Sequence, residues 1–276
     1  MNSTDRIDLI AVPYEGSTSF RRGCRGAPAA IMQELDMISG TGLEAVDDEG
    51  ETATSGMRRV WICEDHLDDP VSMIEASAAA VSQSISEKKI PIVLGGEHTV
   101  SIGTATALCE HYDDFGVVTL DAHADLRHEY EGNIFSHACT LRRIREDLQL
   151  PVAQIGVRSF SRQEADDIKE NMWIVLTPWK LREDGEYGAL MEALSLMPEN
   201  IFLNIDLDVL DPSEAPGVGN PEPGGLGWYE LLDVLYITAQ EKNLLAADVV
   251  EFLPLENDRV TLRLAARLVE KLASVL

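Results

Sequence analysis

Short apolar runs of four to six residues recur along this chain, and they constrain its fold more than any other feature. The runs lie at 7–12, 60–63, 90–94, 116–120, 152–157, 172–176, 201–205 and 245–250. Most are continuously apolar rather than alternating, which is typical of strands buried on both faces of a parallel sheet. Helix-like stretches between or after them lie at 72–88, 101–111, 161–171, 228–242 and 258–276. The alternation predicts an α/β fold, a three-layer αβα arrangement with a mainly parallel, roughly eight-stranded sheet, as a single domain over 1–276.

The charge balance is strongly acidic. Asp and Glu number 48 and Lys and Arg 22, which gives a formal net charge of −26. Such a surface repels nucleic-acid phosphates, so we expect no DNA- or RNA-binding role. We hypothesise that the protein works in a high-salt cytoplasm, where ions screen the repulsion between like charges.

Cysteine usage and hydropathy bear on the location of the protein. The four cysteines show no C-x-x-C spacing, which favours free thiols in a reducing cytoplasm. The first residues lack the basic segment and apolar run of a signal peptide, and no apolar segment is long enough to cross a bilayer. We therefore expect a cytoplasmic protein with no membrane partner.

Acids and imidazoles follow several of the apolar runs directly. They fall in Gly95-Gly96-Glu97-His98, Asp121-Ala-His123-Ala-Asp125, Asp206-Leu-Asp208 and at Glu251. The carboxyl ends of parallel strands meet at one edge of a sheet, which is where open α/β folds place their binding sites. Carboxylates bind hard divalent cations, and imidazole suits manganese, iron, nickel or zinc. The pattern predicts a metal site at this edge.

The spacing within these motifs favours two metal ions over one. Alternate residues on a strand lie about 7 Å apart on the same side, so one ion can hardly collect all three ligands of Asp121-Ala-His123-Ala-Asp125. Two ions about 4 Å apart can do so if Asp121 bridges them and the chain bends after it. Taken singly, each Asp is more typical of a turn or cap and each His of a buried core residue. Several uncompensated acids at one strand edge would nevertheless be costly without cations.

The motifs together resemble those of the ureohydrolase family, which includes arginase and agmatinase. Besides the runs above, Ser136-His137-Ala, Gly156-Val-Arg158-Ser, the Val-Leu-Asp-Pro that follows Asp208, Pro221-Glu-Pro-Gly-Gly and Val250-Glu251 occur in the family's order. The resemblance covers nearly the whole chain and implies an arginase-like fold. It also implies a homo-oligomer, a trimer or a hexamer.

The resemblance implies two manganese ions per subunit and a ligand set for each. One ion would be held by His98, Asp121, Asp125 and Asp206, and the other by Asp121, His123, Asp206 and Asp208. A hydroxide generated between them would attack a guanidinium carbon and release urea and an amine. Asp125 would accept the proton and pass it to the leaving nitrogen, Glu251 would pair with the guanidinium, and His137 would shuttle protons or line the substrate channel.

The substrate itself is less constrained by the sequence. The loop after Asp125 looks more like that of agmatinases than that of arginases, so agmatine, hydrolysed to putrescine and urea, is the leading prediction. Glu129 and Glu131 could attract its distal ammonium, although both could equally be solvated loop acids. Arg127 instead favours a carboxylate, as in guanidinobutyrate or arginine, and N1-aminopropylagmatine is a further alternative. A deacetylase-like metal hydrolase and an inactive regulatory or scaffolding homologue are the competing hypotheses.

Three departures from the family pattern stand out. Gly26-Ala27 replaces an aromatic residue followed by glycine in the segment at 21–31, which is expected to be a loop. Met32 stands where arginine is common, and Asn204 stands where serine or threonine is usual. We expect these differences to alter the rim of the substrate pocket and not the metal site.

Overall fold

One parallel sheet organises the part of the chain that the computed structural model describes, residues 6–40, 57–62, 67, 69–183 and 187–276. Its eight strands lie in the order β2-β1-β3-β8-β7-β4-β5-β6, and every neighbouring pair is parallel. The strands in that order are β2 (Arg58–Trp61), β1 (Ile7–Val12), β3 (Ile90–Gly95), β8 (Asn243–Val250), β7 (Asn200–Asp206), β4 (Gly116–Leu120), β5 (Val152–Ile155) and β6 (Ile174–Leu176). The predicted fold class is confirmed.

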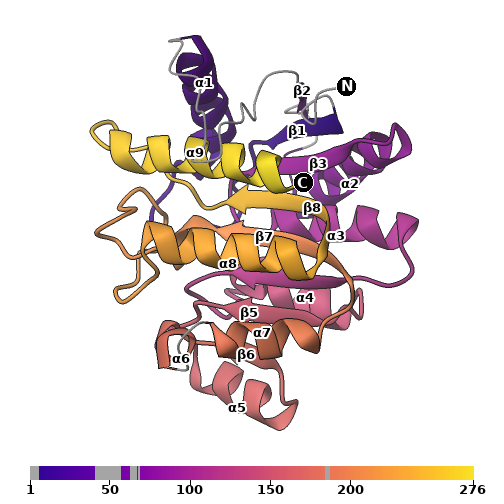
Figure 1. Cartoon of the computed structure of the whole chain (residues 1–276), viewed down its shortest axis with the longest axis vertical. Helices are drawn as coiled ribbons and strands as arrows, with labels where there is room; N and C mark the ends of the chain where they lie inside the picture. The colour runs from indigo at the N-terminus through magenta and orange to yellow at the C-terminus, as the bar shows by residue number, and fades with distance from the viewer. Residues whose placement is uncertain (1–5, 41–56, 63–66, 68, 184–186) are drawn as a thin grey trace.

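Helices cover both faces of the sheet and complete three layers (Figure 1). One face packs on α1 (Ala27–Gly40), α6 (Pro178–Glu183), α7 (Gly188–Ser195), α8 (Trp228–Glu241) and α9 (Arg259–Val275). The other packs on α2 (Pro70–Ser86), α3 (Val100–His111), α4 (Thr140–Glu146) and α5 (Arg162–Glu170). No helix within the described residues is long and apolar enough to cross a membrane.

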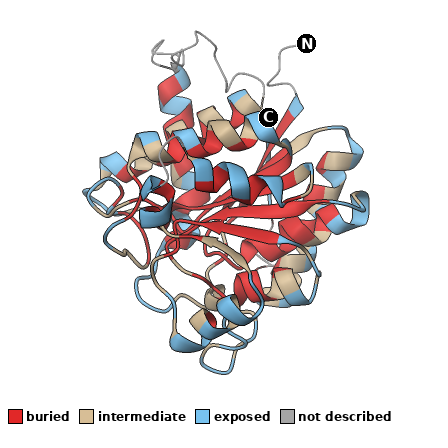
Figure 2. Cartoon of the chain, turned by 60° about the horizontal axis from the view of Figure 1, so that its bottom comes forward, coloured by how far each residue is buried: buried red, intermediate tan, exposed pale blue. Residues whose placement is uncertain are grey.

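The inner strands are buried on both sides, as their hydrophobicity predicts, whereas the edge strand β2 is largely exposed. In β1, Ile7 and Leu9 pack into the core beneath α1 and α9, whereas Ile10 and Val12 pack against α2 on the opposite face. Figure 2 shows the resulting band of buried residues running through the middle of the molecule. Central strands such as β1, β3 and β8 therefore contribute side chains to cores on both faces of the sheet.

The expected elements and the observed ones differ mainly at their ends. The five predicted helices are present with ends within two residues of the predicted ones, and Asp258 caps α9 by accepting hydrogen bonds from the N–H groups of Val260 and Thr261. The second strand was expected at 60–63 but occupies Arg58–Trp61, and Cys63 lies outside the described residues. Helices α4, α6 and α7 were not expected, because segments of six to eight residues are too short to show helical periodicity.

The segment at 21–31 is only partly the loop that was expected. Helix α1 begins at Ala27, with Pro28 in its first turn, where a missing N–H costs no hydrogen bond. Ala27 and Met32 are both buried in the core beneath α1. These two departures from the family pattern therefore affect packing, and neither residue lies at the substrate rim.

The four central strands of the sheet carry the candidate site at their carboxyl ends. β3, β8, β7 and β4 are consecutive in the strand order and lead into His98, Glu251, Asp206 and Asp121 respectively. Gly96 permits this junction, because a Cβ there would lie 2.0 Å from the carbonyl oxygen of Tyr14. The first loop can thus pass directly over the end of β3.

Candidate metal centre

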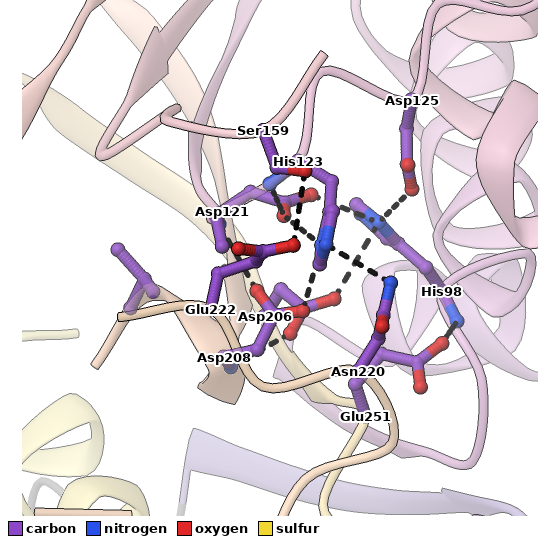
Figure 3. A network of polar contacts seen from close by, with 12 residues as sticks. His98, Asp121, His123, Asp125, Ser159, Asp206, Asp208, Asn220, Glu222 and Glu251 are labelled. Carbon is purple, nitrogen blue, oxygen red and sulfur yellow. Dashed lines mark hydrogen bonds and ion pairs between the residues drawn. The ribbon is translucent and has the colours of Figure 1, made fainter. Parts of the chain in front are cut away.

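Two imidazoles and four aspartates converge at the carboxyl edge of the sheet (Figure 3). His98 Nδ1 lies 2.9 Å from an oxygen of Asp125, 3.2 Å from Asp121 Oδ2 and 3.8 Å from Asp206 Oδ2. His123 Nδ1 lies 2.9 Å from Asp208 Oδ2 and 3.7 Å from Asp121 Oδ1. The structure thus brings together all six residues that the sequence predicts as metal ligands.

Local turns set the spacing within each motif. Asp121 Oδ1 accepts a 2.6 Å hydrogen bond from the N–H of His123, and Asp206 Oδ1 accepts a 2.8 Å bond from the N–H of Asp208. These side chain to backbone bonds bend the chain immediately after β4 and β7, which brings the residue two positions later back toward the cluster. Asp208 Oδ1 also accepts from the N–H of Ala122 at 3.0 Å, which joins the two loops. The aspartates are therefore turn residues and potential ligands at the same time.

Burial and crowding perturb the protonation of the cluster in the absence of metal. Burial, together with the charges of Asp208 and Asp125, raises the pKa of Asp121 to about 7. Burial lowers the pKa of His123, but Asp208 outweighs this effect and raises it to about 10. Burial also raises the pKa of Asp206 well above its usual range. Without cations, shared protons must neutralise these acids.

The donor set fits a pair of divalent cations. His98, Asp121 and Asp125 can each place one ligand atom within 4.8 Å of the others, and so can Asp121, His123 and Asp208. Asp121 belongs to both groups. Its buried Oδ2 makes no hydrogen bond in the described part of the chain, although it lies 3.2 Å from His98 Nδ1. A buried carboxylate oxygen without a hydrogen bond, on a residue shared by two such groups, suits a bridging ligand. Oxygen and imidazole donors without thiolates favour manganese-like ions over structural zinc.

A buried polar network lies behind His98. Its Nε2 is 2.9 Å from Asn204 Oδ1, which also accepts a hydrogen bond from the Thr119 hydroxyl. Asn204 Nδ2 donates to Asp248 Oδ1 at 2.6 Å and to Ser101 Oγ at 3.0 Å. The expectation that Asn204 would alter the substrate rim is therefore wrong. The reason is that Asn204 lies within β7, below the edge of the sheet, where it faces His98.

A cavity of about 250 Å³ opens onto the cluster. His123, Asp125, Asp206, Asp208 and Glu251 line its inner end, and Ser19, Arg127, Tyr130, His137, Ser159, Phe160 and Asn220 contribute to the rest of its wall. The cavity is therefore bounded by acids and an imidazole on the cluster side. Hydroxyl, amide and aromatic groups, the Arg127 guanidinium and the Glu164 carboxylate line the rest.

Two of the predicted catalytic residues meet beside this cavity. His137 Nδ1 lies 3.9 Å from Glu251 Oε1, and His137 Nε2 lies 3.1 Å from Ser19 Oγ. Glu251 Oε1 accepts a 2.8 Å hydrogen bond from the N–H of His98. Glu251 adopts a left-handed backbone conformation with φ of 63°, which is uncommon for a residue with a Cβ. Such local strain is often found at functional positions.

The two acids predicted to attract a distal ammonium lie outside the cavity wall. Glu129 and Glu131 are exposed and are absent from the residues that line the cavity. Arg127 and Tyr130 line it instead, with the Arg127 guanidinium 5.0 Å from the centre of the Tyr130 ring. The role of Glu129 and Glu131 in substrate binding stays a prediction.

Several residues near the cluster had no signal of their own in the sequence. Asn220 Nδ2 lies 3.0 Å from His123 Nε2, and Ser159 donates a 3.2 Å hydrogen bond to Glu222. Ser19 reaches His137 from the loop that follows β1. Asn220 directly precedes the Pro221-Glu-Pro-Gly-Gly motif, and Ser159 ends the Gly156-Val-Arg158-Ser motif, so only their place at a motif associates these two residues with the site.

Comparisons with known proteins agree with this geometry. A model of the arginase family matches residues 5–274. The N(1)-aminopropylagmatine ureohydrolase of Synechocystis sp. is 33% identical over 275 residues, covering 96% of this chain and 87% of that protein. The agmatinase of Halalkalibacterium halodurans is 34% identical, covering 89% of this chain and 83% of that protein. The crystal structure of the agmatine ureohydrolase of Thermoplasma volcanium superposes with a TM-score of 0.85 at 29% identity, covering 99% of this chain and 90% of that one. On these matches and on the fold, this chain belongs to the arginase family.

Proposed function

We propose that this protein hydrolyses a guanidino compound to urea and an amine, with agmatine as the main substrate and putrescine as the second product. The convergence of six imidazole and carboxylate ligands beside one cavity carries the proposal. Membership of the arginase family supports the reaction class, and relatives named agmatinase support the substrate.

The proposed metal is manganese, two ions per subunit. His98, Asp121, Asp125 and Asp206 would hold one ion, and Asp121, His123, Asp206 and Asp208 the other. When bound, such a pair of cations supplies a hydroxide nucleophile at neutral pH without a strong protein base. The shared position of Asp121 between the two groups supports the bridging assignment.

The surrounding residues position the guanidinium and move protons. Glu251 lines the cavity and offers a buried carboxylate, which can bind a guanidinium by charge-assisted hydrogen bonds and hold its carbon over the cluster. Asp125 also lines the cavity and is proposed to transfer a proton to the leaving nitrogen. His137, beside Glu251, is proposed to exchange protons with solvent along the cavity. Glu129 and Glu131 are proposed to attract a distal ammonium from outside.

Two other kinds of guanidino substrate are each favoured by one observation. N1-aminopropylagmatine is favoured by the names of relatives such as that of Synechocystis sp.. A substrate with a distal carboxylate, such as guanidinobutyrate or arginine, is favoured by Arg127, a cation in the cavity wall. A panel of these compounds and agmatine, assayed for urea release with manganese-loaded protein, decides among them. No urea from any of them would refute the proposed reaction.

The remaining proposals concern the state of the protein in the cell. We propose a cytoplasmic, single-domain protein that assembles as a trimer or hexamer, following the resemblance to the family. Multi-angle light scattering of the purified chain measures the assembly directly, and a monomeric mass would contradict it.

A further inference from the structure

We propose that Asn204 is a positioning residue for the metal centre, because its fixed side-chain amide sets which nitrogen of His98 faces the cluster. The inference rests on the proposed metal site and extends it to a residue that differs from the family's usual serine or threonine. Asn204 itself does not touch the cavity. It would act only through the imidazole of His98.

The contacts of Asn204 hold its amide from several sides. Its Oδ1 accepts from Thr119 and lies 2.9 Å from His98 Nε2, while its Nδ2 donates to Ser101 and Asp248. All five side chains are at most 1% exposed, so no bulk water competes for these bonds. Buried and nearly saturated, the amide has one orientation that satisfies its neighbours.

The donor and acceptor roles in this network are fixed from Asp248 through Asn204 to His98. An ionised Asp248 can only accept hydrogen bonds, so the NH₂ group of Asn204 must face it and the carbonyl oxygen must face His98. A carbonyl oxygen accepts only from a protonated Nε2, and that leaves Nδ1 as the nitrogen with a free lone pair when the imidazole is neutral. Nδ1 is the atom that lies within 3.8 Å of Asp121, Asp125 and Asp206. Partners of this kind orient metal-bound histidines in general.

The second imidazole of the cluster offers an internal comparison. Asn220 Nδ2 lies 3.0 Å from His123 Nε2, but no other described side chain makes a hydrogen bond to the amide of Asn220. Asn220 is also partly exposed, whereas Asn204 is buried. The amide of Asn220 can therefore turn over without breaking other bonds. The two histidines thus differ in how firmly their outer nitrogen is held.

The test measures manganese affinity and not only turnover. Asn204→Ser and Asp248→Asn are compared with wild type by chelator competition, by bound manganese after dialysis and by electron paramagnetic resonance. Both variants should lower the affinity for the ion that His98 would hold by about 10- to 100-fold. At limiting manganese, their spectra should shift from a coupled pair toward isolated ions. Asn220→Ser is the matched control. It should lower the affinity for the ion at His98 by no more than about 3-fold.

A double variant separates positioning from a general packing defect. In a His98→Ala background, Asn204→Ser should change the remaining manganese affinity by less than about 3-fold, because its effect passes through the missing imidazole. If Asn204→Ser lowers manganese affinity in the His98→Ala background as much as it does in wild type, the proposal is overturned. Wild-type manganese affinity in folded Asn204→Ser or folded Asp248→Asn would also overturn it. If Asn204→Ser does not fold, Asn204→Leu, which has a similar shape but offers no acceptor to His98 Nε2, takes its place under the same criteria. A wild-type protein that binds no manganese would refute the proposed metal site instead.

Discussion

Replacing Glu251 by Gln should separate function from stability in this protein. Glu251 is only 5% exposed, and burial together with the nearby charge of Glu97 raises its pKa well above the usual range. Gln keeps an oxygen for the N–H of His98 but cannot ionise, so it cannot present the negative charge that Glu251 is proposed to offer to a bound guanidinium. Charge-assisted hydrogen bonds contribute about 3 kcal/mol, so kcat/KM should fall roughly 150-fold.

The stability of the metal-free protein should change in the opposite sense. A raised carboxyl pKa means that the folded chain holds a proton that the unfolded chain has released, so Glu251 stabilises less as the pH rises. The neutral Glu251→Gln variant escapes this loss. Its melting temperature should therefore exceed that of wild type, and the difference should grow from pH 6 to pH 9.

Glu97 provides a matched control, because it is a neighbouring buried acid with different surroundings. Its carboxylate accepts hydrogen bonds of 2.7–2.9 Å from the N–H groups of Gly16 and Ser17 and from the hydroxyls of Ser17 and Thr99. A Gln there leaves at least one of these donors without its charged partner, at a cost of about 2 kcal/mol. For a chain of this size the melting temperature should fall by about 5 °C.

Thermal melts of the metal-free variants and urea assays of the manganese-loaded ones check both predictions. A Glu251→Gln variant that melts below wild type, as Glu97→Gln is expected to, would show that Glu251 is mainly structural. Unchanged kcat/KM in Glu251→Gln would refute its role in binding the guanidinium.

Three further predictions follow from the described contacts. Asp121→Ala should reduce bound manganese below two ions per chain. Activity should fall by about 10³-fold or more, because several kcal/mol of transition-state charge stabilisation are lost with the metal. Two retained ions, measured by elemental analysis, would contradict the bridging role of Asp121. The metal-free protein should lose stability as pH rises from about 7 to about 10, because the folded chain keeps a proton on His123, whose pKa of about 10 lies above the ordinary 6.5. Thermal melts in a pH series measure this, and a melting temperature that increases across that pH range would argue against it. The hydroxyl and N–H of Ser213, followed by the N–H groups of Gly224 and Gly225, lower the pKa of Asp211 to about 2. Asp211→Asn should therefore destabilise the protein at pH 6, and the difference from wild type should vanish as pH falls toward 2; a difference that persists at pH 2 would exclude this cause.

The fold was predictable because its main signal is local. Strands such as β3 and β4 are short, almost entirely apolar and followed within two residues by charged ones, so the sequence indicates both their type and the place where they end. Helices α6 and α7 are too short for periodicity to distinguish them from loops. Helix α1 was obscured because its first residues matched a family segment expected to be a loop.

The cluster of imidazoles and aspartates was predictable for the same reason, whereas its surroundings were not. Asp121 and Asp206 end neighbouring strands, so parallel topology alone brings them together. Asn204 precedes Asp206 by two residues and shares its side of the strand, but the sequence does not say how deep in the sheet that position lies. Contacts such as that between Ser19 and His137 join loops 118 residues apart, and no local pattern encodes them.

The central position of the candidate site has a consequence for how the enzyme matures. β3 and β8 lie side by side, yet more than 140 residues separate them in the chain, and such non-local pairings form slowly. A folding intermediate that lacks this pairing would hold His98 apart from Glu251 and leave the candidate site incomplete. Catalytic competence should therefore arise as an all-or-none property of the finished domain, with no partly active precursor.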